Sequence, residues 1–175
     1  MTKYFFAILL SLSFQVLAQE ISKSELDSLV NLFTYFKGVQ TSENLKKQIE
    51  SNPAITKCGF RMVNEIKQNF DLLNSSQQKI LAPLLQRPQM QKSIVTPKGY
   101  FRVHYDTTGV NAIGYNLTQF LQALDSAYTF EVIFLGYSAP PADGSEGGDN
   151  KYDVYIQNLS GLYGYTQFEN KVSQN

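Results

Sequence analysis

The sequence predicts an α+β fold in which a helical segment is followed by a strand, a helix, a loop and a second strand. Between residues 21 and 90, apolar side chains recur every three or four positions, which is the period of an amphipathic helix. After residue 99, the stretches "YFRVHYD" and "KYDVYIQNL" alternate between the two faces of an extended chain, which is the period of a strand. The change of period, with no internal repeat, divides the chain into a helical half and a mixed half.

The first residues, "MTKYFFAILLSLSFQVLAQE", have the pattern of a secretory signal peptide. Lys3 gives a positive start, an apolar run follows, and Val16 and Ala18 occupy the small-residue positions that a signal peptidase requires. The apolar run is too short, and too interrupted by serine and glutamine, to span a bilayer. We therefore expect residues 1–18 to be a cleaved signal peptide. The chain would then be exported to the periplasm or the exterior of a bacterium, without stable membrane insertion.

The charge balance argues against a nucleic-acid partner. The chain has 15 basic and 15 acidic residues, and removal of Lys3 with the signal peptide leaves 14 against 15. No basic stripe with interleaved aromatic residues is present to bind a phosphate backbone. We expect no nucleic-acid binding, and a protein or peptide partner stays unidentified.

Cys58 is the only cysteine, so the chain has no intrachain disulfide. It precedes an expected helix, where a cysteine is most often a small buried hydrophobic residue. An intermolecular bridge or a reactive thiol is the alternative in an oxidising compartment.

Residues 19–90 are expected to form three or four short amphipathic helices that cover one another. The stretch "SKSE" at residues 22–25 is a capping box that begins the first helix, and Pro53 ends the second. A further capping box, "SSQQ" at residues 75–78, begins the last helix, in which Pro83 predicts a kink. The apolar stripes of these helices are typical of packing surfaces, and nothing in this segment indicates chemistry.

Residues 91–99 contain Pro97 and Gly99 and are predicted to be a linker. The strand that follows has two faces, one with Phe101, Val103 and Tyr105 and the other with Tyr100, Arg102, His104 and Asp106. Asn116 is expected to cap a helix that continues to a stop near Gly136. After a loop rich in Pro, Gly and Asp, the last strand places Tyr152, Val154 and Ile156 on one face.

Several motifs of this chain occur in a fixed order. They are "PKGYFRVHYDTTG", "EVIFLGYSAPPADG" and "GGDNKYDVYIQNLSGLYGYT", with "KCGF" and "LLQRP" upstream. Over residues 57–168 the chain therefore resembles a family of secreted bacterial zinc metalloproteases of the HExxH zincin type. The resemblance implies a helical prosegment-like region at residues 19–90 and, at residues 100–175, part of a zincin-like domain. In such a domain the first sheet and helix precede an HExxH helix, whose two histidines bind zinc and whose glutamate activates the metal-bound water.

The chain departs from that family at the zinc site. HExxH needs two histidines, this chain has only one, and the sequence reaches "ENKVSQN" before the motif would come. We therefore expect no catalytic, cofactor-binding or metal-binding residue in this chain, no zinc, and no peptidase activity from the chain alone. Two hypotheses stay open. The chain is the N-terminal portion of a secreted metalloprotease-like protein, or it is a complete small exported binding module that uses its tyrosine-rich strands.

His104 is interpreted as a half-buried polar residue of a strand. Alternate residues of a strand lie about 6.5 to 7 Å apart, so a hydrogen bond from His104 to Asp106 within one strand would be strained. No nucleophile motif such as GxSxG accompanies this histidine.

Two further groups of residues are candidates for binding. The acidic loop could gather oxygen ligands for calcium, but its spacing does not match an EF-hand, and a solvated glycine-rich loop is the simpler interpretation; its acidic residues are Asp143, Glu146, Asp149 and Asp153. The tyrosines near it serve packing or, if exposed, a glycan-binding or peptide-binding surface; they are Tyr152, Tyr155, Tyr163 and Tyr165.

Overall fold

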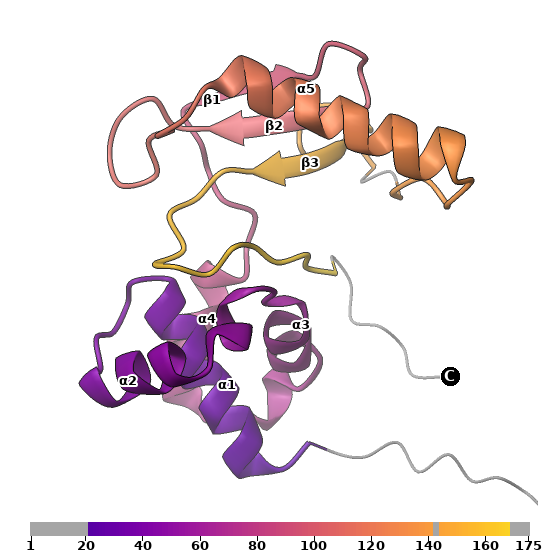
Figure 1. Cartoon of the computed structure of the whole chain (residues 1–175). Helices are drawn as coiled ribbons and strands as arrows, with labels where there is room; N and C mark the ends of the chain where they lie inside the picture. Colours follow the sequence, from indigo (N-terminus) through magenta and orange to yellow (C-terminus); the bar gives the residue numbers. More distant parts are fainter. Residues whose placement is uncertain (1–20, 142–143, 169–175) are drawn as a thin grey trace, which may run out of the picture.

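The computed structural model describes residues 21–141 and 144–168, which form a helical unit and a sheet unit connected by two segments of chain (Figure 1). The helical unit contains α1 (Lys23–Phe36), α2 (Glu43–Ser51), η1 (Pro53–Thr56), α3 (Phe60–Gln68), η2 (Phe70–Leu72) and α4 (Ser75–Leu84). The sheet unit contains β1 (Lys92–Val95), β2 (Phe101–Tyr105), α5 (Leu117–Tyr128), η3 (Thr129–Phe134) and β3 (Tyr152–Tyr155). The protein is thus a mixed α+β structure, as predicted. The expected signal peptide lies outside the described residues.

The caps of the first and last helices of the helical unit differ in part from the prediction. Ser22 caps α1 as expected, accepting a hydrogen bond from the backbone N–H of Glu25 at 3.2 Å. The Glu25 carboxylate, however, pairs with Arg61 at 2.5 Å across to α3. The second capping box begins one residue earlier than predicted, because Asn74 and Gln77 satisfy each other's backbone donors at 3.0 and 3.1 Å. Asn caps a helix as well as Ser does, so Asn74 and Ser75 are both suitable N-cap residues for α4, and the structure uses Asn74.

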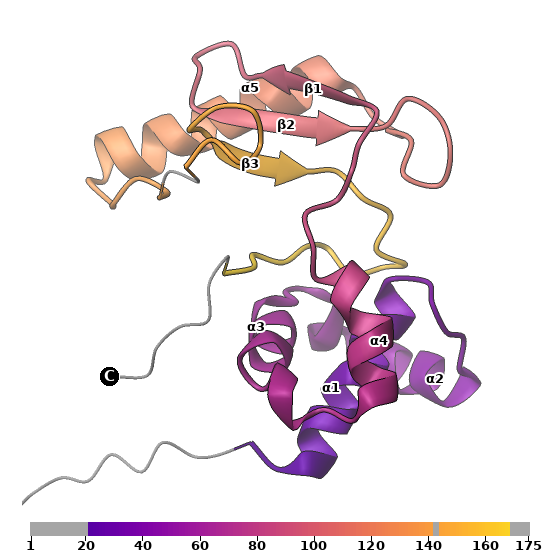
Figure 2. The same ribbon diagram turned by 180° about the vertical axis from the view of Figure 1, so that it is seen from behind.

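The core of the helical unit is made by α1, α3 and α4. Five side chains from these helices have 0 % exposure, namely Phe33, Phe36, Val63, Ile66 and Leu81. A segment from the other end of the chain, residues 157–168, returns from β3 to this unit, as both views show (Figures 1 and 2). We call it the return segment. It adds Leu162 to the buried core, with Leu159 and Tyr165 packed at its margin.

The sheet has three strands in the order β1-β2-β3, antiparallel between β1 and β2 and parallel between β2 and β3. The crossover from β2 to β3 includes α5, which covers one face of the sheet (Figures 1 and 2). The predicted alternation is confirmed for the inner positions, since Val103 is fully buried and packs with Leu121 of α5 and with Ile156, and Tyr105 and Val154 pack against this cluster. Tyr100, predicted on the opposite face, precedes β2 and stacks on Tyr128 of α5 instead. The opposite face is left to polar side chains.

The predicted linker at residues 91–99 is wrong in part, because residues 92–95 form β1. Lys92 lies opposite Tyr105, and Val95 lies opposite Arg102. The turn that follows has Gly99 at φ +81°, a conformation that favours glycine. Asp125 of α5 accepts a hydrogen bond from the backbone N–H of Lys98 at 2.7 Å and so fixes this turn against the helix. A polar, proline-containing stretch thus forms an edge strand once β2 is beside it.

The helix after residue 117 continues to Gly136, as predicted, but it changes character on the way. Residues 129–134 form a π-helix, and Gly136 ends the helical segment at φ +76°. Four large apolar side chains near this end are exposed, namely Phe130, Ile133, Phe134 and Leu135. Across the described residues, every helix is too short or too polar to cross a membrane.

Candidate functional site

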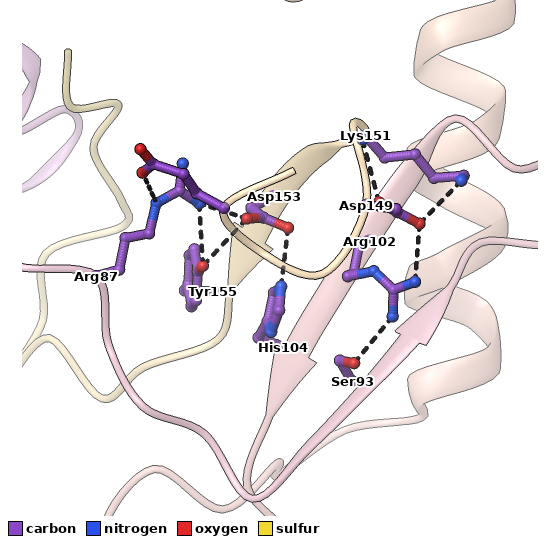
Figure 3. Close-up of polar contacts among 9 residues, drawn as sticks. Arg87, Ser93, Arg102, His104, Asp149, Lys151, Asp153 and Tyr155 are labelled. Carbon is purple, nitrogen blue, oxygen red and sulfur yellow. Dashed lines mark hydrogen bonds and ion pairs between the residues drawn. The ribbon is translucent and has the colours of Figure 1, made fainter. Parts of the chain in front are cut away.

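The face of the sheet opposite α5 gathers the charged and aromatic polar side chains of the second half of the chain (Figure 3). Successive side chains of a strand point to opposite faces, so burial of Val103 places its neighbours Arg102 and His104 on this face. The parallel register sets Arg102 beside Asp153 and His104 beside Tyr155. A glycine-rich loop at residues 144–150 and Arg87, which follows α4, complete the group. We call it the polar face.

Asp153 is the centre of the polar face. Its side chain is only 5 % exposed, and it contacts three donors. Oδ1 lies 2.8 Å from Nε2 of His104, and Oδ2 accepts a hydrogen bond from the Tyr155 hydroxyl at 3.1 Å. Oδ2 also pairs with the guanidinium of Arg87. A carboxylate that is withdrawn from water needs partners of this kind, so the three donors together make burial of Asp153 tolerable.

His104 contributes to this network as a flat, oriented ring. It stacks on the ring of Tyr155 with the centroids 4.5 Å apart and the planes 12° from parallel. The hydrogen bond to Asp106 that was expected to be strained is absent from the described contacts of His104. The aspartate partner comes instead from the neighbouring strand, while Asp106 accepts from the backbone N–H of Gln91 at 2.7 Å. Burial raises the pKa of Tyr155, which keeps its hydroxyl a proton donor.

A second ion cluster lies beside the first. Asp149 accepts from Arg102 at 2.7 Å and from Lys151 at 2.9 Å. These hydrogen bonds hold the pKa of the Asp149 carboxyl well below its usual range, and the bond that Arg102 donates to Asp149 raises the pKa of Arg102. Arg102 also donates to the Ser93 hydroxyl at 3.1 Å, which links the cluster to β1. The loop is therefore anchored to β2 by charge, and this cluster remains ionised in mildly acidic solution.

Gly147 allows the loop to cross directly over Asp153. A Cβ built on Gly147 would lie 1.8 Å from Oδ2 and 2.3 Å from Cγ of Asp153, far inside contact distance. The loop and the carboxylate consequently fit together only with glycine at this position. Neither Gly147 nor Arg87 stands out in the sequence as a site residue. Gly147 is one of several glycines in its loop, and Arg87 owes its role to Asp153, 66 residues later.

The acidic residues of the loop do not converge on one point, as a calcium site would require. Glu146 pairs with Arg87 at 3.2 Å, Asp149 with Arg102 and Lys151, and Asp153 with Arg87 and His104. Asp143 lies outside the described residues. Within residues 21–141 and 144–168, no group of three His, Cys, Asp or Glu side chains could hold a metal ion. The loop is thus tied by ion pairs, which differs from the solvated loop expected from its composition.

Zinc, which the resemblance implies for full-length relatives, does not fit the residues present. A catalytic zinc needs three protein ligands, of which at least two are usually nitrogen or sulfur donors. The polar face offers one such donor, the ring of His104. The single histidine has its Nε2 directed at Asp153, and Asp153 is shared with Arg87 and Tyr155. The charged side chains of the polar face are paired with one another. These pairs hold the loop against strands β2 and β3.

The four candidate tyrosines do not form one surface. Tyr155 belongs to the polar face, and Tyr152 contacts the ring of Phe101 edge to face at 6.3 Å. Tyr165 packs against Phe33 in the helical unit, whereas Tyr163 is 81 % exposed. Cys58, expected to be buried, is exposed instead, because the chain bends between η1 and α3 at this point.

Comparison with protein-family models, with curated proteins and with solved structures finds no match for this chain.

Proposed function

We propose that the chain is the N-terminal portion of a zinc-metalloprotease-like protein of the HExxH zincin type, exported through a signal peptide at residues 1–18, and that it lacks the HExxH motif itself. In this proposal the helical unit is a prosegment-like region, and the sheet unit is the opening sheet and helix of a zincin-like domain. One observation carries the proposal. It is the order of strand β2, covering helix α5 and parallel strand β3 within the stretch that resembles the family.

The exposed apolar residues of the sheet unit support a partial domain. Near the end of η3, Phe130 is 56 % exposed, Ile133 60 % and Phe134 76 %. Strand β3 is also at the edge of the sheet in the described chain. Contiguous apolar groups and open strand edges are normally covered by other protein. Further segments of a zincin-like domain would supply that cover.

The proposed protein has no peptidase activity in the form of this chain. The HExxH mechanism requires two histidines one helical turn apart to hold zinc, and the sequence contains a single histidine, His104. That histidine is already engaged with Asp153 on the polar face. Activity in this proposal belongs to a polypeptide that also contains the HExxH helix.

The test is the genomic sequence downstream of codon 175. An HExxH codon pattern in the continuing or a shifted frame supports the proposal. Expression of that longer frame should then give casein hydrolysis that a zinc chelator abolishes. A stop codon followed by an unrelated gene contradicts it and favours the second candidate, a small exported interaction module. This second candidate would use its tyrosine-rich strands, and the observation that favours it is the exposure of Tyr163, which is 81 % exposed.

A further inference from the structure

The return segment contacts the helical unit both through its backbone and through its side chains. The N–H of Gly59 donates to the carbonyl of Gly164 at 2.9 Å, and the N–H of Tyr163 donates to the carbonyl of Thr56 at 2.8 Å. The ammonium of Lys67 donates to the carbonyl of Phe168. Residues 162–168 form neither helix nor strand. Recognition through main-chain groups of an extended segment is how proteins bind peptides with limited dependence on sequence.

Asn64 is the central contact of this interface. Its side chain is buried, with the residue 4 % exposed, and both ends of its amide are used. Nδ2 donates to the carbonyl of Thr166 at 2.9 Å, and Oδ1 accepts from the N–H of Phe168 at 2.9 Å. The side-chain amide of Asn64 therefore binds a carbonyl and an N–H of residues that are two positions apart in the return segment, and this spacing matches the repeat of an extended chain. Without the segment, Oδ1 of this buried amide would lose the partner shown here, at an energetic cost.

Two side chains of the return segment anchor it at a spacing of three residues. Leu162 is 6 % exposed within the helical core. Tyr165 contacts Phe33 edge to face at 6.0 Å, and Nζ of Lys37 lies 3.3 Å from its hydroxyl. Gly59 leaves room for both anchors, because a Cβ there would lie 3.0 Å from Cδ2 of Leu162 and 3.2 Å from Cβ of Tyr165. The helical unit thus provides a fitted surface for an aliphatic and an aromatic anchor.

The surface that receives the return segment lies over the most buried side chains of the helical unit. The side chains with 0 % exposure in the helical unit all come from α1, α3 and α4, and Leu162 and Tyr165 of the return segment pack against this core. We propose that the helical unit is a peptide-binding module centred on Asn64. Its ligand is an extended segment with an aliphatic anchor followed three residues later by an aromatic one. In this chain the return segment is that ligand, bound in cis. This role goes beyond the proposed function and does not depend on it.

The experiment uses the full chain and a fluorescent peptide with the sequence of residues 157–168. In the unaltered chain the tethered segment competes at an effective concentration of about millimolar, so the free peptide binds weakly. The double variant Leu162→Ala, Tyr165→Ala weakens the ligand and leaves the site intact. We expect it to bind the free peptide at least about tenfold more tightly, since buried anchors carry most of the energy of such contacts. Fluorescence anisotropy measures both affinities.

Three controls separate recognition from loosening of the fold. Tyr163→Ala, an exposed position in the same segment, should bind the peptide as weakly as the unaltered chain does. Adding Asn64→Leu to the double variant should abolish the gain. A peptide with alanine at both anchor positions should not bind the double variant. A folded double variant that does not bind the free peptide more tightly overturns the proposal.

A measurement on the unaltered chain covers the case in which the double variant does not fold. Hydrogen exchange at the amides of Tyr163 and Gly59 reports the bonds between the return segment and the helical unit. An excess of free peptide should displace the tethered segment and raise the exchange rate of the Tyr163 amide. An unchanged rate at saturating peptide would refute the proposal. Either result leaves the downstream-sequence test of the metalloprotease proposal unaffected.

Discussion

The substitution Asp153→Asn tests whether the polar face stabilises the fold through charge. The amide has nearly the shape of the carboxylate, so packing under the loop is retained while the negative charge is removed. Arg87 then loses its charged partner on β3, while the Tyr155 hydroxyl and Glu146, whose side chain is 65 % exposed, stay within its reach. The changed group is 5 % exposed, so water replaces little of what is lost.

The expected loss is about 2–3 kcal/mol of the free energy of unfolding. A hydrogen bond to a charged group is worth about 1.5–3 kcal/mol, and removing one partner of a fully buried ion pair costs about 3–5 kcal/mol. We expect a loss in the lower part of this combined range, because the Arg87 side chain is 25 % exposed and water can solvate part of its charge. With a urea dependence of about 1–3 kcal/mol per molar, the transition midpoint should fall by about 0.7–3 M.

Urea unfolding followed by far-UV circular dichroism and by tyrosine fluorescence measures this loss, since the chain has no tryptophan. Glu146→Gln is the matched control and should change the free energy by less than about 0.5 kcal/mol, as exposed ion pairs do. A double-mutant cycle of Asp153→Asn with Arg87→Met should give a coupling of about 1 kcal/mol or more. A variant within 0.5 kcal/mol of the parent, or a cycle without coupling, would refute the reasoning.

Three further predictions concern Gly147 in the loop, the ion cluster of Asp149 and the exposed aromatic rings near the end of η3. Gly147→Ala should destabilise the sheet unit by about 1–3 kcal/mol or more, because its Cβ would overlap the Asp153 carboxylate, and thermal unfolding measures this; an unchanged melting temperature would contradict it. The pKa of Asp149 is lowered in the folded state, so its stabilisation is present above the unfolded pKa of about 3.9 and is lost as the pH falls toward the folded value. The difference in unfolding free energy between the parent and Asp149→Asn should therefore shrink between about pH 5 and pH 2, and a constant difference would be inconsistent with this linkage. The double variant Phe130→Ser, Phe134→Ser should bind less of a hydrophobic dye than the parent does, since these rings are 56 % and 76 % exposed; equal dye fluorescence would show that the dye binds elsewhere.

Local patterns predicted those elements whose burial is periodic along the chain. The stripe through Phe33 and Phe36 indicated α1, and alternation around Val103 indicated β2, because each of these side chains points into a core made by its own element and its neighbour. Asn116 was recognised as a cap because a cap acts within four residues, and it accepts from the N–H of Gln119 at 3.1 Å. Patterns of this kind need no knowledge of the rest of the fold.

The features that the sequence did not predict depend on residues distant along the chain. Strand β1 has few large apolar residues of its own and is formed by the antiparallel pairing of its four residues with β2. Arg87 follows a helix and precedes a proline, the usual setting of a solvent-exposed residue, yet it pairs with Asp153, 66 residues later. Tyr165 was grouped with the other tyrosines of the mixed half, but it packs with Phe33 of α1. In each case the partner is supplied by tertiary structure, which no window of local sequence contains.

The return segment has a consequence for how the chain folds. The surface around Asn64 is completed by Thr166, 102 residues later, so the helical unit is discontinuous in sequence. Its helices emerge early in synthesis, but their last covering layer appears only after the whole sheet unit has been made. Contacts of such large sequence separation form slowly, because a long loop must close first. Until then the groups that receive Leu162 stay accessible, and a chaperone that binds nascent chains would meet the helical unit in that open state.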